Sequence, residues 1–450
     1  MTVKKESKKR TAALHNLGCK VNAYETESMQ QMLEAAGYEI VDFAETADVY
    51  VINTCSVTNM ADRKSRQMIH RARGKNPAAV IVAAGCYVQT AGEEIKKDLS
   101  IDILIGNNKK AELIPLLEQY FADHAHAVDV IDINDGIQPY EELTLAKTGE
   151  HTRAFMKVQD GCNQFCSYCI IPYARGRVRS RDPKSVYEEA CTLAENGYRE
   201  IVLTGIHLSS YGVGEEFGLL ELIRMVHEIP GIERIRLGSL EPRIITEEFV
   251  QQLSELRKIC PHFHLSLQSG CDETLVRMNR KYTTEEYAHS CELLRGVYEH
   301  PAITTDVIVG FPGETPEEFA QTKRFLERIG FYEMHVFQYS KRHGTRAERM
   351  PDQVPETVKK ARSGELLALV EEQSKAFRDF YIGKEQTVLF EEDMQIGAKR
   401  YMVGFTPEYV RLAMELAPDE AASDYTNRLC TGTVAGVLTE ELYLFCQTGG

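Results

Sequence analysis

Three cysteines in one short loop, Cys162, Cys166 and Cys169, are the feature that most constrains how this chain folds. They follow an apolar run at residues 154–158, which predicts a β-strand ending just before the loop. Three thiolates fill three irons of a four-iron cluster and leave the fourth iron open to another ligand. A zinc knuckle or buried core thiols are the alternatives. Zinc usually takes four ligands in two pairs, and no second pair follows, so the spacing favours the cluster.

The length of 450 residues predicts about three domains, and the 43% hydrophobic and 26% charged residues are typical of an ordered globular protein. No run of about 18 apolar residues is present, so we expect no membrane span. The Lys-rich start at residues 1–10 lacks the apolar core of a secretion signal. Twelve cysteines in such a chain indicate metal ligation or reduced thiols, which predicts a cytoplasmic location.

The net charge of −15 argues against a protein that coats nucleic acid. Positive charge is nevertheless concentrated at residues 63–75, 175–181 and 341–349. Such local clusters of Lys and Arg bind phosphates whatever the total charge. Solvated helix faces are the alternative reading of each cluster.

The first 135 residues alternate strand-like and helix-like segments, which predicts a parallel sheet of the Rossmann or flavodoxin type. Strands are expected at residues 11–16, 48–53, 79–84 and 101–105, and helices at 24–36, 59–73 and 109–120. Cys19, Cys55 and Cys86 each follow one of the first three strands. Ligand sites form beyond the carboxyl ends of parallel strands, so these thiols should meet at one edge. A second three-thiolate cluster is favoured over buried or unrelated cysteines.

A polar stretch at residues 136–150 reads as a linker, and the alternation then resumes with a longer period. Strands are expected at 153–158, 200–203, 234–237, 263–267, 304–309 and 334–339, and helices at 183–196, 219–228, 247–257, 284–298 and 316–330. Six such units predict a partly open parallel barrel over residues 151–380, with its chemistry at the C-terminal strand ends. A helix is expected at 356–381, and short strand patterns over residues 381–450 predict a small β-barrel.

Several residues at the barrel strand ends are candidates for contacting a ligand. Gly310 and Gly313, with Asp306 before them, form a glycine-rich turn that a flat ring could approach. Ser266 and Gln268 occupy alternate positions of an expected strand, so both should face the barrel interior, unless they only bond to neighbouring strands. The remaining candidates are Gly205 at the end of the second barrel strand and the arginines after the cysteine loop, Arg175, Arg177, Arg179 and Arg181.

The pattern as a whole closely resembles the methylthiotransferases of the radical S-adenosylmethionine (SAM) superfamily. The resemblance rests on Gly18 to Asn22 (GCKVN), Asn53 to Cys55 (NTC), Gly85-Cys86 and Gly161 to Gly176 (GCNQFCSYCIIPYARG). It covers essentially the whole chain. It implies an N-terminal cluster domain, a central partial radical SAM barrel and a C-terminal barrel of the RNA-binding type known as TRAM.

The resemblance also implies the cofactors and the chemistry. A 4Fe–4S cluster on Cys162, Cys166 and Cys169 would bind SAM and, once reduced, cleave it to a deoxyadenosyl radical. A second 4Fe–4S cluster on Cys19, Cys55 and Cys86 would carry sulfur and accept a methyl group from another SAM. The expected SAM contacts are Gly205, Ser266, Gln268, Asp306, Gly310 and Gly313. The expected substrate contacts are Arg175, Arg177, Arg181 and Glu241, with an arginine pairing with a substrate carboxylate.

The sequences of Gly18 to Glu27 and of Ser239 to Pro242 most resemble those of the branch called MtaB. That branch adds a methylthio group to C2 of N6-threonylcarbamoyladenosine at position 37 of tRNA. The alternatives are a branch that acts on isopentenyladenosine in tRNA, a branch that acts on a ribosomal protein, and an iron–sulfur regulator without catalysis. The expected partners are the tRNA anticodon loop and a reducing protein such as flavodoxin or ferredoxin, with no membrane, and we expect a monomer.

The sequence departs from the family pattern in two places. Ile206-His207 stands where many relatives carry Gln, which weakens the assignment of a polar contact after Gly205. From Lys384 onward the chain has five basic and eleven acidic residues, so its last domain is a poor phosphate binder by itself.

Overall fold

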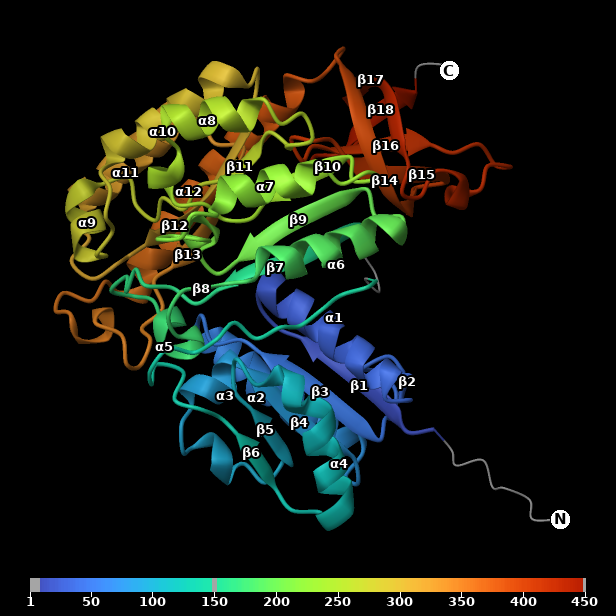
Figure 1. Cartoon of the computed structure of the whole chain (residues 1–450). Coiled ribbons are helices and arrows are strands. Elements are labelled where there is room, and N and C mark those ends of the chain that lie inside the picture. Colours follow the sequence, from blue (N-terminus) through green and yellow to red (C-terminus); the bar gives the residue numbers. More distant parts are fainter. Residues whose placement is uncertain (1–8, 148–151, 448–450) are drawn as a thin grey trace. The chain divides into compact units, whose positions relative to one another are not determined.

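The computed structural model describes residues 9–147 and 152–447 (Figure 1). The first eight residues of the Lys-rich start and the last residues of the predicted linker, 148–150, lie outside the described residues. The chain forms two compact units. Their boundaries are residues 1–146, 155–182 and 340–348 for the first unit, and 147–154, 183–339 and 349–450 for the second.

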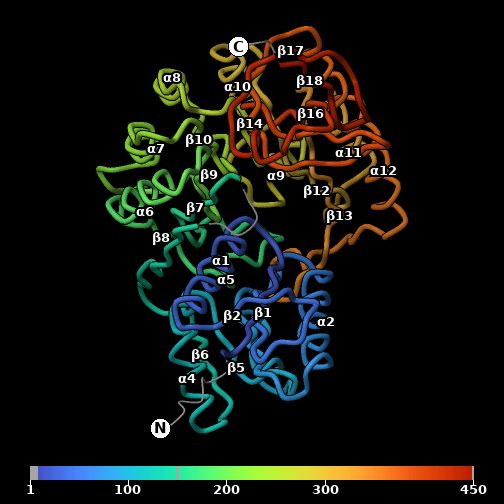
Figure 2. The backbone as a smooth tube through the Cα atoms, turned by 90° about the vertical axis from the view of Figure 1, so that its right-hand side faces the viewer, coloured from blue at the N-terminus to red at the C-terminus, as the bar shows by residue number. Residues whose placement is uncertain are grey.

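The first unit contains a six-stranded sheet in which every neighbouring pair is parallel. The strands in spatial order are β2 (Glu39–Ile40), β1 (Thr11–Asn16), β3 (Val49–Thr54), β4 (Val80–Gly85), β5 (Ile103–Ile105) and β6 (Ala127–Asp129). The helices are α1 (Lys20–Ala35), α2 (Asn59–Lys75), α3 (Cys86–Thr90) and α4 (Leu113–Asp123). Helices α1 and α4 lie on one side of the sheet and α2 lies on the other (Figure 2). Buried side chains of α1 and α4 pack on the first face and those of α2 on the second.

The sequence dictates this sheet because β3 and β4 are apolar on both faces and fully buried. Parallel strands covered by helices on both sides require that pattern. The expected parallel α/β fold is confirmed. The two edge strands β2 and β6 escaped prediction because they are only two and three residues long and carry polar residues.

The cysteine loop of the first unit lies between two antiparallel strands. β7 (Arg153–Asp160) precedes the loop, α5 (Ile171–Arg175) follows it, and β8 (Arg179–Ser180) pairs with the end of β7. The sequence did not predict β8, because a two-residue strand carries no periodicity.

The second unit contains the other parallel strands of the central region. Their bounds are β9 (Glu200–Gly205), β10 (Arg234–Leu237), β11 (His262–His264), β12 (Ala302–Val309) and β13 (Glu333–Gln338). β9 pairs with β10 and β11 to β13 pair in order, while two isolated parallel bridges join the β10 segment to the β11 segment. The helices are α6 (Pro183–Glu195), α7 (Leu219–His227), α8 (Glu247–Ser254), α9 (Asp272–Arg277), α10 (Thr284–Val297) and α11 (Pro316–Ile329).

One barrel strand is shorter than its sequence indicates. β11 ends at His264, whereas an apolar alternation predicted strand up to Leu267. The carbonyl oxygens of Ser266 and Leu267 accept hydrogen bonds from the Tyr282 hydroxyl, and Gln268 adopts a left-handed backbone with φ of +75°. The regular ladder is interrupted at Leu267, whose amide donates to the Thr305 hydroxyl, while the Gln268 amide still donates to the Asp306 carbonyl oxygen. Ser266 and Gln268 therefore lie beyond the regular strand in which they were predicted, in a segment that still pairs with β12.

The last part of the chain is a closed five-stranded barrel, entered from the long helix α12 (Glu356–Asp379). In spatial order its strands are β14 (Glu385–Ile396), β15 (Lys399–Phe405), β16 (Arg411–Glu415), β18 (Tyr443–Gln447) and β17 (Leu429–Val437). The expected small β-barrel is confirmed. No helix in the described part of the chain is long and apolar enough to cross a membrane.

Candidate functional site

Three neighbouring strands of the first unit deliver three thiols to one edge of their sheet. Cys19 lies between β1 and α1, Cys55 follows the last residue of β3, and Cys86 is the first residue of α3 after β4. The strands β1, β3 and β4 are adjacent and parallel. A Cβ atom added to Gly18 would lie 3.0 Å from the Cys55 sulfur, so the first loop runs directly against the second cysteine. The folding of the sheet therefore assembles this trio.

Asparagine side chains hold these loops in place. Asn22 Nδ2 donates to the carbonyl oxygens of Leu17 and Thr54, at 2.7 and 3.0 Å. Asn53 Nδ2 donates to the Asn22 carbonyl oxygen at 3.0 Å. Asn107 Nδ2 lies 3.4 Å from the Cys86 sulfur. These contacts join the segments that carry the three cysteines, so buried polar contacts fix the thiol positions.

The second trio lies in the loop after β7, in the same unit. Cys162, Cys166 and Cys169 are all partly exposed. The loop opens on Gly161 with φ of +71°, and the Cys162 amide donates to the Gly176 carbonyl oxygen at 3.0 Å. The helix α5, which directly follows this loop, packs against α3, which begins at Cys86. One compact unit thus contains all six predicted ligands.

A buried ion network lies beside the Cys19 trio. Arg175, fully buried, donates to both carboxylate oxygens of Glu25 at 2.8 and 3.0 Å, and to Asn22 Oδ1 at 2.6 Å. Its Nη1 is also 3.2 Å from Asp160. Lys157 bridges the same two carboxylates, at 2.8 Å from Glu25 and 2.7 Å from Asp160. Burial opposes ionisation of Glu25, yet the charges of Arg175 and the two buried lysines hold its pKa well below its usual value.

The network carries more positive than negative charge. The buried carboxylates of the network are Glu25 and Asp160. The buried cations are more numerous, namely Lys110, Lys157, Arg175 and Arg179. Glu141, whose pKa is raised by burial, lies near the lysines and, even when ionised, would leave one positive charge unbalanced. A buried surplus of charge is costly unless an anion faces it.

The three thiols lie beside this surplus and would balance it as the thiolates of a bound cluster. Burial raises the pKa of the Cys55 thiol to about 11, and the charge of Arg175 opposes that rise. Burial also disfavours the charged form of Arg175, but Glu25, Asp160 and the Cys86 thiolate together raise its pKa well above the usual value. Arg175 Nε is buried and has no hydrogen-bond acceptor among the described residues. An anionic thiolate-bound iron–sulfur cluster fits this environment.

The predicted substrate arginines fall into two groups. Arg177 is exposed and lies over the Phe165 ring of the cysteine loop, 4.5 Å from its centroid. Arg175 and Arg181 are buried, and Arg181 pairs with the Glu142 carboxylate and the Tyr24 hydroxyl. The assignment of Arg175 to a substrate carboxylate does not hold, because the side chain is fully buried and Glu25, Asp160 and Asn22 engage both of its terminal nitrogens. Arg181 is likewise engaged within the protein.

The glycine-rich turn after β12 is shaped by packing as well as by a possible ligand. A Cβ atom at Gly310 would lie 2.3 Å from Lys359 Cγ, and one at Gly313 would lie 3.3 Å from Arg277 Nε. The Glu314 carboxylate accepts the backbone amides of Gly310 and Phe311 and closes the turn. The space beside each glycine is filled by protein, so packing against Lys359 and Arg277 also accounts for these two glycines.

The other predicted contacts of the second unit lie at the strand ends. Gly205 ends β9 and is partly exposed, and Ser266 and Gln268 follow β11. Glu241 is buried, accepts from Arg243 at 2.9 Å and lies 3.7 Å from His207 Nε2. The pairing of His207 with Glu241 joins the loops after β9 and β10. Asp306, in β12, lies beside His264.

Comparisons with known proteins agree with this layout. Residues 11–106 match the family described as Uncharacterized protein family UPF0004, and residues 156–326 match the radical SAM superfamily. A protein of Bacillus subtilis named threonylcarbamoyladenosine tRNA methylthiotransferase MtaB is 43% identical over 91% of each chain. A protein of the same name from Aquifex aeolicus is 40% identical over 87% of this chain and 95% of its own.

This chain belongs to the radical SAM methylthiotransferase family. A relative from Acetivibrio thermocellus, 38% identical over 86% of this chain and 82% of its own, is named tRNA-2-methylthio-N(6)-dimethylallyladenosine synthase. The radical SAM methyltransferase TsrM from Kitasatospora setae, solved with cobalamin and a [4Fe–4S] cluster, shares the fold with a TM-score of 0.54. It is 18% identical and is aligned over 74% of this chain and 75% of its own. The prediction of SAM and 4Fe–4S clusters as cofactors is confirmed for this methylthiotransferase at the level of its family.

Sequence reasoning missed the residues that support the predicted ligands. Glu25, Lys110, Lys157 and Asp160 are charged residues in ordinary-looking segments, and only the fold brings them together. A weak signal existed for Asp160, because an acidic residue directly precedes Gly161 and the cysteine loop at the end of a predicted strand.

Replacing Gly161 by alanine should damage the Cys162 loop. The new Cβ would lie 1.9 Å from the Arg177 carbonyl oxygen, where nothing can yield without moving the backbone. The matched control is Gly37→Ala, which also has positive φ but has no atom within 4 Å of the added Cβ. The control should cost about 1–2 kcal/mol of stability for its backbone alone. Gly161→Ala should lower the midpoint of thermal unfolding further and reduce the iron retained per chain after anaerobic reconstitution; equal effects would contradict the assignment.

Replacing Arg175 by methionine should destabilise the first unit by about 3–5 kcal/mol, because two buried carboxylates lose a shared partner. Arg177→Met is the control, since its guanidinium is exposed over an aromatic ring and should contribute at most about 1 kcal/mol. Denaturant unfolding measures the stability. Electron paramagnetic resonance during a redox titration should show a lower reduction potential for the cluster of the Cys19 trio in the Arg175 variant only. An unchanged potential would mean that Arg175 is purely structural.

Proposed function

We propose that this methylthiotransferase adds a methylthio group to C2 of N6-threonylcarbamoyladenosine at position 37 of tRNA. The observation that carries the proposal is the pair of three-cysteine sets in one compact unit, one at the ends of parallel strands and one in the β7 loop. Relatives named MtaB, which match about nine-tenths of the chain, support the choice of substrate.

The two trios divide the work. When bound, a cluster on Cys162, Cys166 and Cys169 would supply the electron for SAM cleavage, and one on Cys19, Cys55 and Cys86 would supply the site for sulfur. An aromatic C–H bond is too weak an acid for ordinary general bases, so a radical cofactor is needed to break it. The chain's own residues hold the thiols, since Asn22, Asn53 and Asn107 fix the strand-end loops. Arg175 compensates negative charge beside the first trio.

Gly205 and Gln268 remain our proposed SAM contacts in the second unit, together with the backbone of the Gly310 to Gly313 turn. Ser266 is partly exposed next to Gln268 and belongs to the same proposal. The buried Glu241 is proposed to position its loop through His207 and Arg243, since its carboxylate is already engaged by both.

The distribution of positive charge supports tRNA as the partner. All three basic segments of the sequence contribute to the first unit, which also contains the six cysteines. The helix that carries the first segment contacts the third, since Asn59 at the start of α2 donates to the Lys341 carbonyl oxygen at 2.9 Å. Exposed basic side chains remain on both segments and beside the cysteine loop, namely Arg63, Lys64, Arg66, Arg71, Arg177, Lys341 and Arg346. Such side chains bind phosphates.

The substrate's threonyl carboxylate needs a positive partner. Arg177 is our candidate because it is exposed and stacked on the Cys162 loop. A flavodoxin- or ferredoxin-like reductant, a cytoplasmic location with the tRNA, and a monomeric enzyme complete the proposal.

Loss of the gene should remove the methylthio form of threonylcarbamoyladenosine from tRNA. Mass spectrometry of tRNA nucleosides from a deletion strain should show this loss while methylthio-isopentenyladenosine stays at its normal level. Complementation with the wild-type chain should restore the product. Loss of the isopentenyl form instead would assign the enzyme to the other tRNA branch, and no change in either would favour a ribosomal protein or a regulator.

Alanine at Cys162, Cys166 or Cys169 should abolish formation of deoxyadenosine from SAM under dithionite. Alanine at Cys19, Cys55 and Cys86 together should spare that cleavage and stop methylthiolation. Cys446→Ala, at an exposed position on the C-terminal barrel, is the control and should behave as wild type in both assays. A normal product from the Cys19/Cys55/Cys86 variant would refute the division of labour.

A further inference from the structure

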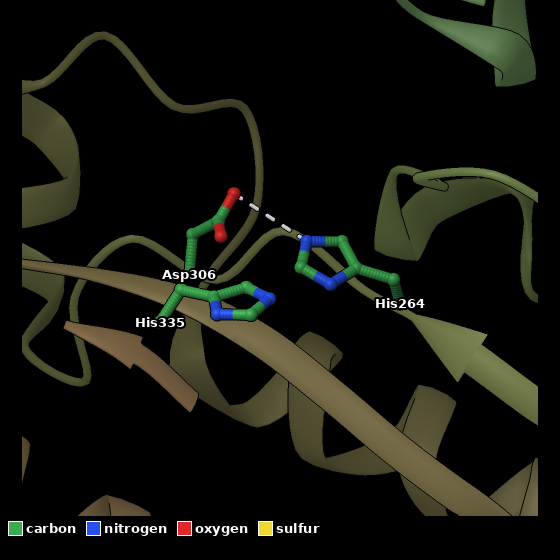
Figure 3. A group of neighbouring side chains, drawn as sticks. All are labelled: His264, Asp306 and His335. Atoms are coloured by element: carbon green, nitrogen blue, oxygen red, sulfur yellow. Dashed lines mark ion pairs between the residues drawn. The ribbon is translucent and has the colours of Figure 1, made fainter. Parts of the chain in front are cut away.

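Three polar side chains from the neighbouring parallel strands β11, β12 and β13 point toward one another in the second unit (Figure 3). They are His264 of β11, Asp306 of β12 and His335 of β13. In the sheet register Asp306 is the partner of His335, and His264 is the partner of Thr304, two residues before Asp306. Residues that are paired or two apart lie on the same face of a sheet. The three side chains therefore share one face by construction of the strands.

Their donor atoms are close enough to share an ion. One nitrogen from each histidine and one carboxylate oxygen lie within 4.8 Å of one another. His264 Nε2 is 3.4 Å from Asp306 Oδ2, and the two imidazole rings are nearly parallel with centroids 6.0 Å apart. Two imidazole nitrogens and one carboxylate oxygen form a common donor set for zinc and for non-haem iron(II).

A second observation supports a ligand role for His264. Its other ring nitrogen, Nδ1, lies 3.0 Å from the Thr304 hydroxyl. Metal-binding histidines usually bond through the second nitrogen to a neighbouring polar group, which fixes the tautomer and the ring orientation. The hydroxyl thus keeps Nε2 directed toward Asp306 and the shared space.

The charge of this face favours a cation. The Asp306 carboxylate lies among the two histidines, and Glu333, the register partner of Thr304, adds a second carboxylate to the face. An ordinary ion pair with Asp306 explains the position of His264. It does not explain why His335 lies beside the same carboxylate.

The group is also accessible. His335 is exposed and lines a cavity of about 810 Å³ bordered by β13, α12 and the C-terminal barrel, all in the second unit. An ion could enter from this cavity, and three protein ligands would leave positions open for water or another oxygen ligand.

We propose that His264, Asp306 and His335 bind one divalent transition-metal ion, separate from both cysteine trios. This site is independent of the proposed tRNA substrate. Asp306, predicted from the sequence to contact SAM, is assigned to this ion instead. Thr304 acts as a positioning residue, because it touches the ion only through His264.

Zinc is the probe that tests the site. The full chain is reconstituted anaerobically so that iron occupies both trios, then exposed to Zn²⁺, desalted and analysed for metal. About one zinc per chain should remain beyond the iron. X-ray absorption at the zinc edge should show nitrogen and oxygen ligands at about 2.0–2.1 Å and no sulfur at about 2.3 Å. No retained zinc, or a shell that contains sulfur, would overturn the proposal.

Variants locate the zinc. His335→Ala, at an exposed position, should lower zinc affinity more than about 100-fold, and Thr304→Val should lower it about 10- to 100-fold, as loss of a supporting group does. His289→Ala is the matched control, because His289 also lies near a carboxylate, Glu292, but on the surface of α10. It should bind zinc as wild type does. Iron content and circular dichroism verify the fold of each variant, and wild-type affinity in the folded His335 and Thr304 variants would refute the site.

Discussion

The buried contact of Arg175 with Glu25 and Asn22 is the interaction on which the rest of the first unit depends. Arg175 follows the Cys162 loop by a few residues, whereas Glu25 and Asn22 belong to the helix that starts after Cys19. One guanidinium therefore fastens the loop of one cysteine trio to the frame of the other. Because the cation is fully buried, its charge needs its carboxylates in place, and removal of either would leave a buried charge without a partner. Both cysteine trios therefore share this support.

Both units use parallel strands to bring side chains of one chemical kind together, but the kind of side chain differs between them. In the first unit, parallel strands bring their carboxyl ends together and the loops after them carry soft sulfur ligands. In the second unit, the face of β11, β12 and β13 carries nitrogen and oxygen donors at successive register positions. Sulfur suits iron–sulfur clusters, and imidazole with carboxylate suits single divalent ions. The strand register sets both arrangements, since it decides which side chains share a face or an edge.

The C-terminal barrel is attached to the central strands by specific contacts. It is acidic overall. Arg234 and Arg236 at the start of β10 donate to backbone carbonyl oxygens around residues 387 and 405–407, so the barrel is attached to the parallel strands by buried arginines. These contacts make it a structural partner of the central strands.

The sequence alone determined the fold class, both cysteine trios and the family, because ligand spacing, buried apolar strands and the glycines beside the cysteines are local properties of the chain. It also indicated the limits of most helices and strands, since 3.6- and 2-residue periodicities are local. The tertiary structure decided which charged residues support those ligands, where β11 ends and that His264, Asp306 and His335 meet. It also removed Arg175 from the substrate. These outcomes depend on contacts between residues far apart in the chain, and no local pattern shows which buried charge will find its partner.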